Sequence, residues 1–121
     1  MTFPITSSAA RIREAIRDRA GRDVGVIVSD SFGRPVRQGT TEVALGVAGL
    51  TPMRDLRGVR DSVGYELHAT QIAVADELAG AAELVMGKVN GIPAAVIRGV
   101  DLRGPGTGAD LPIPEERDLF R

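Results

Sequence analysis

Residues 24–31 read Val-Gly-Val-Ile-Val-Ser-Asp-Ser, and this stretch decides the fold. Its first five residues are apolar and mostly β-branched, with glycines on both sides of the run. A short run of this kind is typical of a buried strand and is too short for a buried helix. The sequence therefore predicts a strand over residues 24–28, whose exit carries Ser29, Asp30 and Ser31 into a turn.

A helix is predicted before this strand. Ser7 and Ser8 are expected to cap its start, because serine hydroxyls accept hydrogen bonds from free backbone N–H groups. Gly21 is expected to end it in a left-handed conformation. The inward stripe, at helical spacing, consists of Ala9, Ile12, Ile16 and Ala20.

A second helix is predicted over residues 71–86, with Thr70 as its cap and Gly87 as its end. Apolar residues occupy nearly every face of this helix. We therefore expect more than one face to be buried, by the sheet and by another chain or segment. Self-association into a homo-oligomer is one way to bury the second face.

Two further strands are predicted over residues 42–47 and 92–97, and residues 49–64 are interpreted as a long surface connection. Together these elements define an α/β (α+β) fold, in which two helices pack on a small mixed β-sheet. The domain is expected over residues 1–104. The glycine- and proline-rich residues 105–121 are expected to form a tail or linker.

The composition excludes several classes of protein. Fifteen basic and sixteen acidic side chains leave a net charge of −1, which argues against the broad positive field of a nucleic-acid-binding protein. No cysteine is present, which excludes a disulfide framework, a thiolate metal site and a cysteine nucleophile. The sequence shows neither a membrane-length apolar run nor a secretion signal, so no membrane partner and a cytoplasmic location are expected.

The best position for chemistry is the end of the buried strand, because a strand end holds side chains rigidly beside a cleft. Asp30 and the hydroxyl of Ser31 are oxygen ligands of the kind that Mg or Mn prefers. Asp and Ser in such a place also serve as ordinary turn residues. Arg34 and Arg37 flank Pro35 in the next loop, where their guanidinium groups either face one anionic ligand or remain solvated.

A glycine-rich turn follows the second helix over residues 86–93, where small residues allow a ligand to approach the backbone. It is not a Walker phosphate loop, because its spacing differs and it follows a helix instead of preceding one. His68, the sole histidine, stands in no recognised nucleophile motif and is interpreted as a structural or surface residue.

Four strings of the chain, taken in order, closely resemble the coenzyme F420-0 gamma-glutamyl ligase family. They are VIVSDSFGRPVRQGTTEVALGVAGL, DLRGVRDSVGYEL, TQIAVADELAGAAELVMGK and GIPAAVIRGVDLRGPG. Several long strings in the right order are a more specific signal than a single glycine motif. The ending PEERDLFR is also similar to the point where, in bifunctional actinobacterial members, the ligase domain passes into a nitroreductase-like domain.

The resemblance implies a GTP-dependent ligase that joins a deazaflavin coenzyme precursor to L-glutamate. GTP would activate the terminal carboxylate of the precursor as an acyl phosphate, and the glutamate amine would displace phosphate to form an amide. Mg or Mn would offset the phosphate charge. Because the family is dimeric with interwoven sheets, a homodimer interwoven with a partner subunit is implied as well.

The resemblance also implies roles for particular residues. Asp30 and Ser31 match the family's Asp-Thr metal pair, and Asp30 and Arg34 form the implied catalytic set. Lys88 falls where some members place a glutamine that binds metal, and an ammonium group there would repel a cation and could contact phosphate instead. The implied guanine-nucleotide segment consists of Met86, Gly87, Lys88, Val89, Asn90, Gly91, Ile92 and Pro93.

Other positions also depart from the family pattern near the implied site. They are Val36 for Trp, Thr40 for Gln, Glu42 for Asp and Gln71 for Glu. The family's amino-terminal half, with its first nucleotide loop, has no counterpart in these residues. Three hypotheses stay open: part of a ligase active site completed by an amino-terminal half, a non-catalytic oligomerising or ligand-binding module of the same fold, and a ligase-like enzyme for another carboxylate.

Overall fold

The computed structural model describes the backbone of residues 4–106 and the side chains of residues 7–106. Its elements, in chain order, are α1 (Pro4–Ala20), β1 (Val26–Gly33), β2 (Thr40–Ala48), β3 (Arg54–Asp55), β4 (Gln71–Ile72) and α2 (Val74–Met86). This combination of helices and small sheets confirms the α/β (α+β) class. Within this part of the chain, neither helix combines the length and the apolarity that crossing a bilayer requires.

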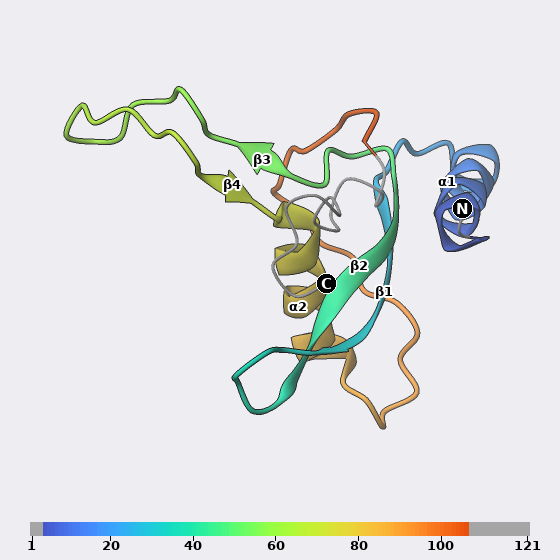
Figure 1. Cartoon of the computed structure of the whole chain (residues 1–121). Helices are drawn as coiled ribbons and strands as arrows, with labels where there is room; N and C mark the ends of the chain where they lie inside the picture. The colour runs from blue at the N-terminus through green and yellow to red at the C-terminus, as the bar shows by residue number, and fades with distance from the viewer. Residues whose placement is uncertain (1–3, 107–121) are drawn as a thin grey trace.

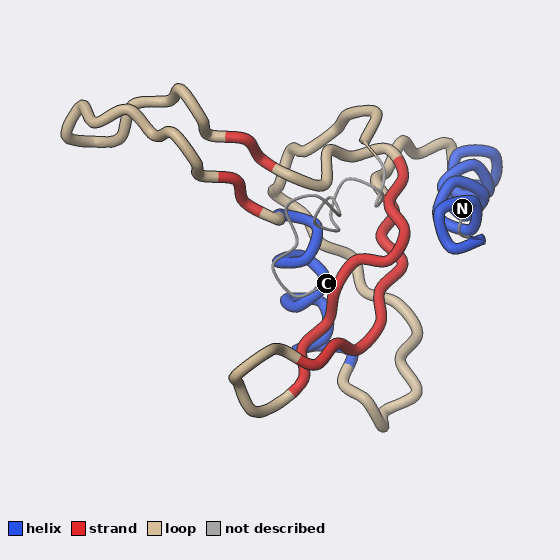
Figure 2. Tube along the Cα trace, in the orientation of Figure 1, coloured by secondary structure: helices blue, strands red, loops and turns tan. Residues whose placement is uncertain are grey.

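An antiparallel ribbon of β1 and β2 forms the centre of the molecule (Figures 1 and 2). The predicted strands over residues 24–28 and 42–47 are confirmed in position, although β1 begins two residues later and runs on to Gly33. Residues 29–31 therefore belong to the strand and not to a turn. The prediction ended the strand too early because these polar residues pair with β2, a contact that local sequence does not reveal.

The ribbon contains a β-bulge. The register shifts between Val28 and Ser29, and Leu45 of β2 lies between consecutive pairs without a partner on β1. An extra residue shifts the alternation of inward and outward side chains along a strand. On the far side of the bulge, Glu42 and Ala44 are both buried, whereas Leu45 is 38% exposed.

The two helices lie on opposite sides of the ribbon (Figure 1), and both pack mainly against β2. Ala9 of α1 is fully buried, as the predicted inward stripe requires, but Ile12 is 45% exposed. The main cluster of buried apolar side chains therefore lies on the side of α2. It comprises Ala44, Val47, Leu50 and Ala75, with Ile27 and Leu102 packed against it.

The predicted serine cap of the first helix is wrong. Helix α1 begins at Pro4, so Ser7 and Ser8 lie within it. Proline is favoured at the start of a helix because it has no N–H group to leave unbonded there. The predicted end is confirmed: Gly21 has φ 65°, and its N–H donates to the carbonyl of Arg17 at 2.9 Å.

The second helix begins later than predicted. Thr70 does not cap it, because Gln71–Ile72 form β4 and pair antiparallel with Arg54–Asp55 of β3. Helix α2 starts at Val74 instead. Pairing with a distant segment thus overrides the local capping signal.

The end of α2 agrees with the prediction. Gly87 has φ 66° and ψ −175°, and its N–H donates to the carbonyl of Glu83 at 2.8 Å. Two large apolar side chains of the last turn, Leu84 and Val85, are 84% and 71% exposed. This face of α2 is therefore uncovered in the single chain.

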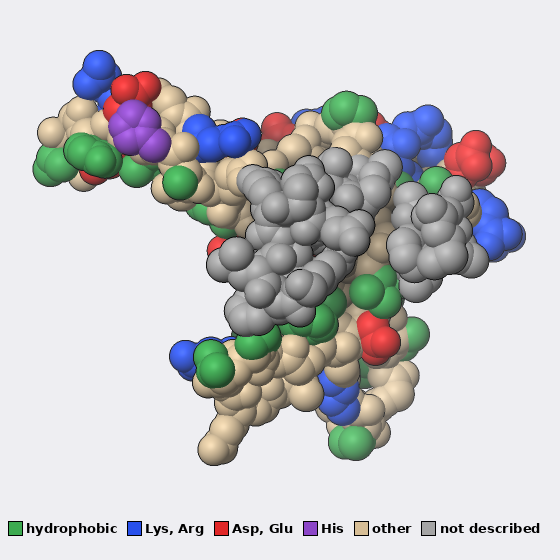
Figure 3. All heavy atoms as spheres, viewed as in Figure 1, with side chains coloured by type: hydrophobic (Ala, Val, Ile, Leu, Met, Phe, Trp, Pro, Cys, Tyr) green, Lys and Arg blue, Asp and Glu red, His purple; other side chains and the backbone are tan. Residues whose placement is uncertain are grey.

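β3 and β4 form the base of an arm that projects from the body, where the sequence predicted only an irregular surface connection (Figures 1 and 2). The bridge between Arg60 and Glu66 continues the hairpin outward. Hydrophobic and charged side chains are both visible on the arm (Figure 3). His68 is exposed there, in agreement with a surface role. Its ring lies edge-on to that of Tyr65, with 6.2 Å between the ring centroids.

The predicted strand over residues 92–97 is wrong. These residues are exposed and form no regular element, because they find no strand edge with which to pair. Both sheets of the described chain are antiparallel pairs, so the expected mixed pairing does not occur within residues 4–106. The chain returns to the body where the carbonyl of Leu102 accepts a hydrogen bond from Thr51 at 2.6 Å. Most of the predicted tail, residues 107–121, lies outside the described residues.

Candidate functional site

Three polar side chains share one face of the β1–β2 ribbon. Ser31 pairs directly with Glu42 across the ribbon. Because residues two apart on a strand share a face, Ser29 belongs to the same face. Glu42 is only 7% exposed. A carboxylate removed from water in this way requires hydrogen-bond or charged partners.

Lys88, from the loop after α2, supplies that partner. Its Nζ donates a hydrogen bond to Ser31 Oγ at 2.5 Å and forms a short ion pair with Glu42 Oε1. Ser31 Oγ also donates to Glu42 Oε1 at 3.4 Å. We refer to Ser29, Ser31, Glu42 and Lys88 as the carboxylate cluster.

The cluster is an ion pair at neutral pH. The hydrogen bond from Lys88 holds the pKa of Glu42 below its ordinary value of 4.5, against the opposing effect of burial, and the hydroxyls of Ser29 and Ser31 assist. The same contact with Glu42 raises the pKa of Lys88 above 10.5. Both groups therefore keep their charges over the physiological range.

Asp30 lies beside the cluster but does not bond to its side chains. Its Oδ1 accepts a hydrogen bond from the backbone N–H of Ser31 at 2.8 Å, and its side chain is exposed. Neighbouring residues of a strand point to opposite faces. The structure thus brings Ser31 together with Glu42 and Lys88, while Asp30 remains at the exposed edge, within electrostatic reach of Lys88.

Arg34 lies in the loop between β1 and β2, beside a cavity of about 430 Å³. One terminal nitrogen, Nη2, donates to the carbonyl of Gln38 at 2.7 Å, whereas Nε is buried without a hydrogen-bond partner. Glu42 and Asp76 also line this cavity. Arg34 is therefore a cation at the wall of a cavity that also has acidic side chains on its wall, and Arg37 is exposed elsewhere in the loop.

In the predicted nucleotide segment, residues 86–93, Met86 is the last residue of α2 and residues 88–93 form an exposed loop. Gly87 and Gly91 have φ values of 66° and 67°, which favour glycine. Of this segment, Lys88 belongs to the carboxylate cluster, where it bonds to Ser31 and Glu42. Val89 is 92% exposed. Most of the segment therefore faces solvent in the single chain.

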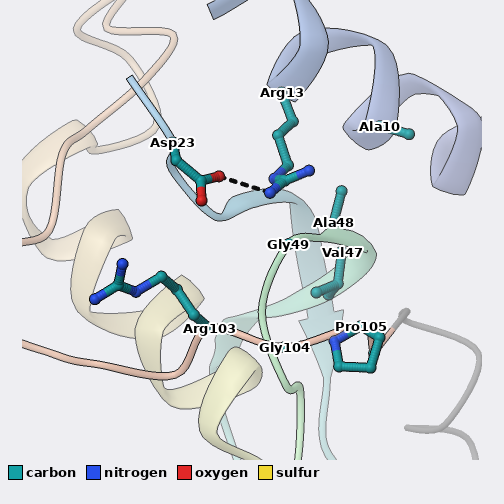
Figure 4. A pocket seen from close by; sticks show the side chains of 10 residues that line it. Ala10, Arg13, Asp23, Val47, Ala48, Gly49, Arg103, Gly104 and Pro105 are labelled. Carbon is teal, nitrogen blue, oxygen red and sulfur yellow. Dashed lines mark hydrogen bonds and ion pairs between the residues drawn. The ribbon is translucent and has the colours of Figure 1, made fainter. Parts of the chain in front are cut away.

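Another cavity, of about 550 Å³, lies where α1 meets β2 and the returning segment (Figure 4). On its wall, Arg13 Nη2 pairs with Asp23 Oδ1 at 2.6 Å, and Arg13 Nε donates to the carbonyl of Val24 at 3.1 Å. These contacts join α1 to the chain entering β1. The cavity shares no residue with the carboxylate cluster.

The cluster offers oxygen ligands suited to a divalent cation, but only a few of them. Hydroxyl and carboxylate oxygens are the ligands that Mg prefers, and Mg needs as few as one or two protein carboxylates when water or phosphate completes its shell. Within residues 7–106, no three His, Cys, Asp or Glu side chains gather as a metal site. The described residues therefore offer too few of these ligands for a complete metal site of their own.

Residues 4–99 contain the whole ribbon and the carboxylate cluster, and they match the family model of a ligase described as F420-0:Gamma-glutamyl ligase. The chain therefore belongs to the F420-0:gamma-glutamyl ligase family. This match confirms the resemblance found in the sequence.

Individual relatives are named coenzyme F420:L-glutamate ligase. The protein of Methanocaldococcus jannaschii is 47% identical over 116 residues, and that of Methanothermobacter thermautotrophicus is 48% identical over 118 residues. Each match covers 94% of this chain but 47% of the relative. The chain thus spans about half the length of the curated relatives that it matches.

Sequence reasoning identified Ser31 and Lys88 separately but missed the contact that joins them through Glu42. The sequence carried no signal for the inward position of Glu42, because Val43, Leu45 and Val47 alternate as the apolar face of the strand and would leave Glu42 outward. The bulge at Leu45 changes this alternation and leaves Glu42 and Ala44 buried, where a charge needs a partner. Lys88 is the sole lysine, but 46 residues separate it from Glu42, and no local pattern links them.

Proposed function

We propose that this chain contributes part of the active site of a GTP-dependent coenzyme F420-0:L-glutamate ligase. The observation that carries the proposal is the identity of 47–48% with proteins named coenzyme F420:L-glutamate ligase, over 94% of this chain. The substrates are then GTP, L-glutamate and the deazaflavin coenzyme precursor.

The proposed reaction has two steps. The terminal phosphoryl group of GTP is transferred to a carboxylate oxygen of the precursor, which releases GDP and leaves an acyl phosphate. The amine of glutamate then attacks the acyl carbon, the carbon–oxygen bond to phosphate breaks, and the amine loses a proton as the amide forms. Because charge accumulates on phosphate oxygens in both steps, the protein acts mainly by positioning groups and by placing positive charge.

The described residues offer groups for these tasks. Arg34 presents a guanidinium group of the kind that binds phosphate or carboxylate. Asp30 and Ser31 offer oxygens for Mg or Mn, which would supply charge neutralisation when bound. Residues 86–93 would contact the guanine nucleotide through backbone groups. The ammonium group of Lys88 would lie close enough to contact its phosphates.

The exposed apolar surface supports completion of this site by a second segment or subunit. Ordinary folded domains expose few contiguous large apolar groups. Here the last turn of α2 and the returning chain leave several uncovered, with exposed fractions of 84% for Leu84, 71% for Val85 and 81% for Val96. An amino-terminal half, in the same or another polypeptide, or an interwoven homodimer would cover them.

The test is to complement the chain with the amino-terminal half of the Methanocaldococcus jannaschii relative, expressed as a separate polypeptide. Mass spectrometry would follow glutamate addition to the precursor in the presence of GTP and Mn. We expect turnover only with both polypeptides. Asp30→Ala should lower the turnover rate by about a hundredfold or more if Asp30 helps to neutralise the charge on the transferred phosphoryl group. Asp101→Ala, which removes another exposed carboxylate, is the matched control.

A second candidate is a non-catalytic oligomerising or ligand-binding module of the same fold. The contact of Lys88 with Ser31 and Glu42 favours it, because an ammonium group already holds these oxygens. If the two polypeptides associate tightly but give no turnover with any carboxylate substrate, this candidate replaces the first. Turnover with a different carboxylate, and not with the coenzyme precursor, would instead identify a ligase of altered specificity.

A further inference from the structure

The carboxylate cluster already contains a cation, and that cation belongs to the chain itself. Lys88 Nζ lies 2.5 Å from Ser31 Oγ and in closer contact with Glu42 Oε1. The Glu42 side chain is only 8% exposed, so its charge depends on this partner.

The same two oxygens have the spacing of cation ligands. Ser31 Oγ and Glu42 Oε1 lie 3.4 Å apart. Adjacent oxygens around an octahedral Mg ion lie about 3 Å apart, given its ligand distances. One divalent cation could therefore contact both oxygens, but only in the space that the ammonium group occupies.

Lys88 is placed so that it can leave. Its side chain is 49% exposed, unlike that of Glu42. It projects from the turn between Gly87 and Gly91 on a four-carbon stem with many rotamers. Movement of the ammonium group into solvent thus requires no change in the ribbon.

We propose that Lys88 competes with a divalent cation for Ser31 Oγ and Glu42 Oε1, so that the metal enters only when the ammonium group leaves. Lys88 is then a determinant of metal affinity in this half of the site. The inference rests on the metal dependence in the proposed function, but its test needs neither GTP nor turnover.

The first measurement is Mn binding to the purified chain, followed by the electron paramagnetic resonance signal of free Mn. Lys88→Gln and Lys88→Met both remove the competitor and should both bind Mn about tenfold tighter or more than the natural chain, since a unit charge a few ångströms from the ion is removed. Methionine offers no oxygen ligand, so a gain in Lys88→Gln that is missing in Lys88→Met would come from the added amide and would overturn the proposal. Lys88→Arg keeps the charge and should bind as weakly as the natural chain. Arg11→Gln, a loss of one charge on the exposed side of α1, controls for net charge.

The double variant Lys88→Gln, Glu42→Gln tests whether the gain in Mn affinity depends on the carboxylate of Glu42. It should lose the extra affinity, because the carboxylate is then absent. Equal Mn affinity in the natural chain and Lys88→Gln, or no binding in either, overturns the proposal. The same gain in Arg11→Gln also overturns it, because net charge would then explain the effect.

A second measurement covers the case in which Lys88→Gln fails to fold. Because Lys88 is the sole lysine, reductive methylation with carbon-13 gives one lysine resonance besides that of the terminal amine. Competition predicts a saturable shift of this resonance on titration with Mg. A constant resonance overturns the proposal, while missing ligase turnover alongside a saturable shift counts only against the proposed function.

Discussion

Asp76 of α2 accepts a hydrogen bond from the backbone N–H of Ala44 in β2, with an oxygen-to-nitrogen distance of 2.9 Å. A helix side chain is thus bonded directly to the backbone of the strand that carries Glu42. Asp76 also lies in the first turn of α2, where a negative charge is favourable. This bond fixes the helix in relation to the carboxylate cluster.

Replacement of Asp76 by alanine should lower the free energy of unfolding by roughly 1–2 kcal/mol, because a partly buried N–H loses its acceptor. Urea unfolding followed by circular dichroism measures the change. Asp76→Asn keeps an acceptor oxygen and should retain most of the stability. The exposed neighbour Glu77→Ala should cost no more than about 0.5 kcal/mol. Equal losses in Asp76→Ala and Glu77→Ala would show that the bond to Ala44 contributes nothing.

Gly87→Ala should destabilise the fold by roughly 1–3 kcal/mol, because φ 66° with ψ −175° is a conformation that almost only glycine adopts. An added Cβ would also lie 2.7 Å from Asn90 Nδ2. Thermal unfolding measures the loss. Gly33→Ala is the control, since no atom lies within 4 Å of its added Cβ and its φ is not positive. A tolerated Gly87→Ala alongside a damaging Gly33→Ala contradicts the argument.

Local sequence predicted the carboxyl ends of the two helices but not which segments pair with one another. Gly21 and Gly87 end the two helices as expected, because a positive φ is a requirement of a single residue. The cap at Thr70 failed because Gln71–Ile72 pair with a strand many residues earlier. The strand over residues 92–97 failed for the complementary reason, since an apolar run becomes a strand only where a sheet edge is available.

In the candidate site as well, the sequence indicated properties of single residues but not contacts between distant ones. The chemical type of Ser31 marked it as a site residue, and the resemblance to a ligase family added Lys88 and placed both in one reaction. The shift of register at the bulge, which leaves Leu45 without a partner and Glu42 inward, is a property of two paired strands. The contact of Glu42 with Lys88 therefore became visible only in three dimensions.

The carboxyl group of Asp55 should titrate with a pKa of about 2. The guanidinium group of Arg57 is the main cause, with distances of 2.9 Å and 3.1 Å from Nε to the two carboxylate oxygens, and the backbone N–H of Arg57 adds a second bond. Carbon-13 NMR of the carboxyl resonance measures this value. Arg57→Gln should raise it only part of the way to 3.8, because the backbone bond remains.

Arg54→Gln is the control for Asp55, because it removes a neighbouring charge on β3 without removing that hydrogen bond. The pKa of Asp55 should then change much less than in Arg57→Gln. An Asp55 pKa that stays near 2 in Arg57→Gln would assign the shift to other groups.

Glu42 should make the stability of the fold depend on pH in the acidic range. Its pKa lies below 4.5 in the folded chain, chiefly because Lys88 donates to it, so the folded state favours the ionised form. The stabilisation is complete above pH 4.5 and is lost as the pH falls from 4.5 through the lower folded pKa. In Lys88→Met the carboxylate loses its charged partner, its burial still raises the pKa, and only the hydroxyls of Ser29 and Ser31 still lower it, so this part of the acid destabilisation should shrink or reverse. The difference in unfolding free energy between the two chains, measured by urea unfolding across the acidic range, isolates Glu42 from the other carboxylates. Identical pH slopes would mean that the ion pair does not stabilise the fold.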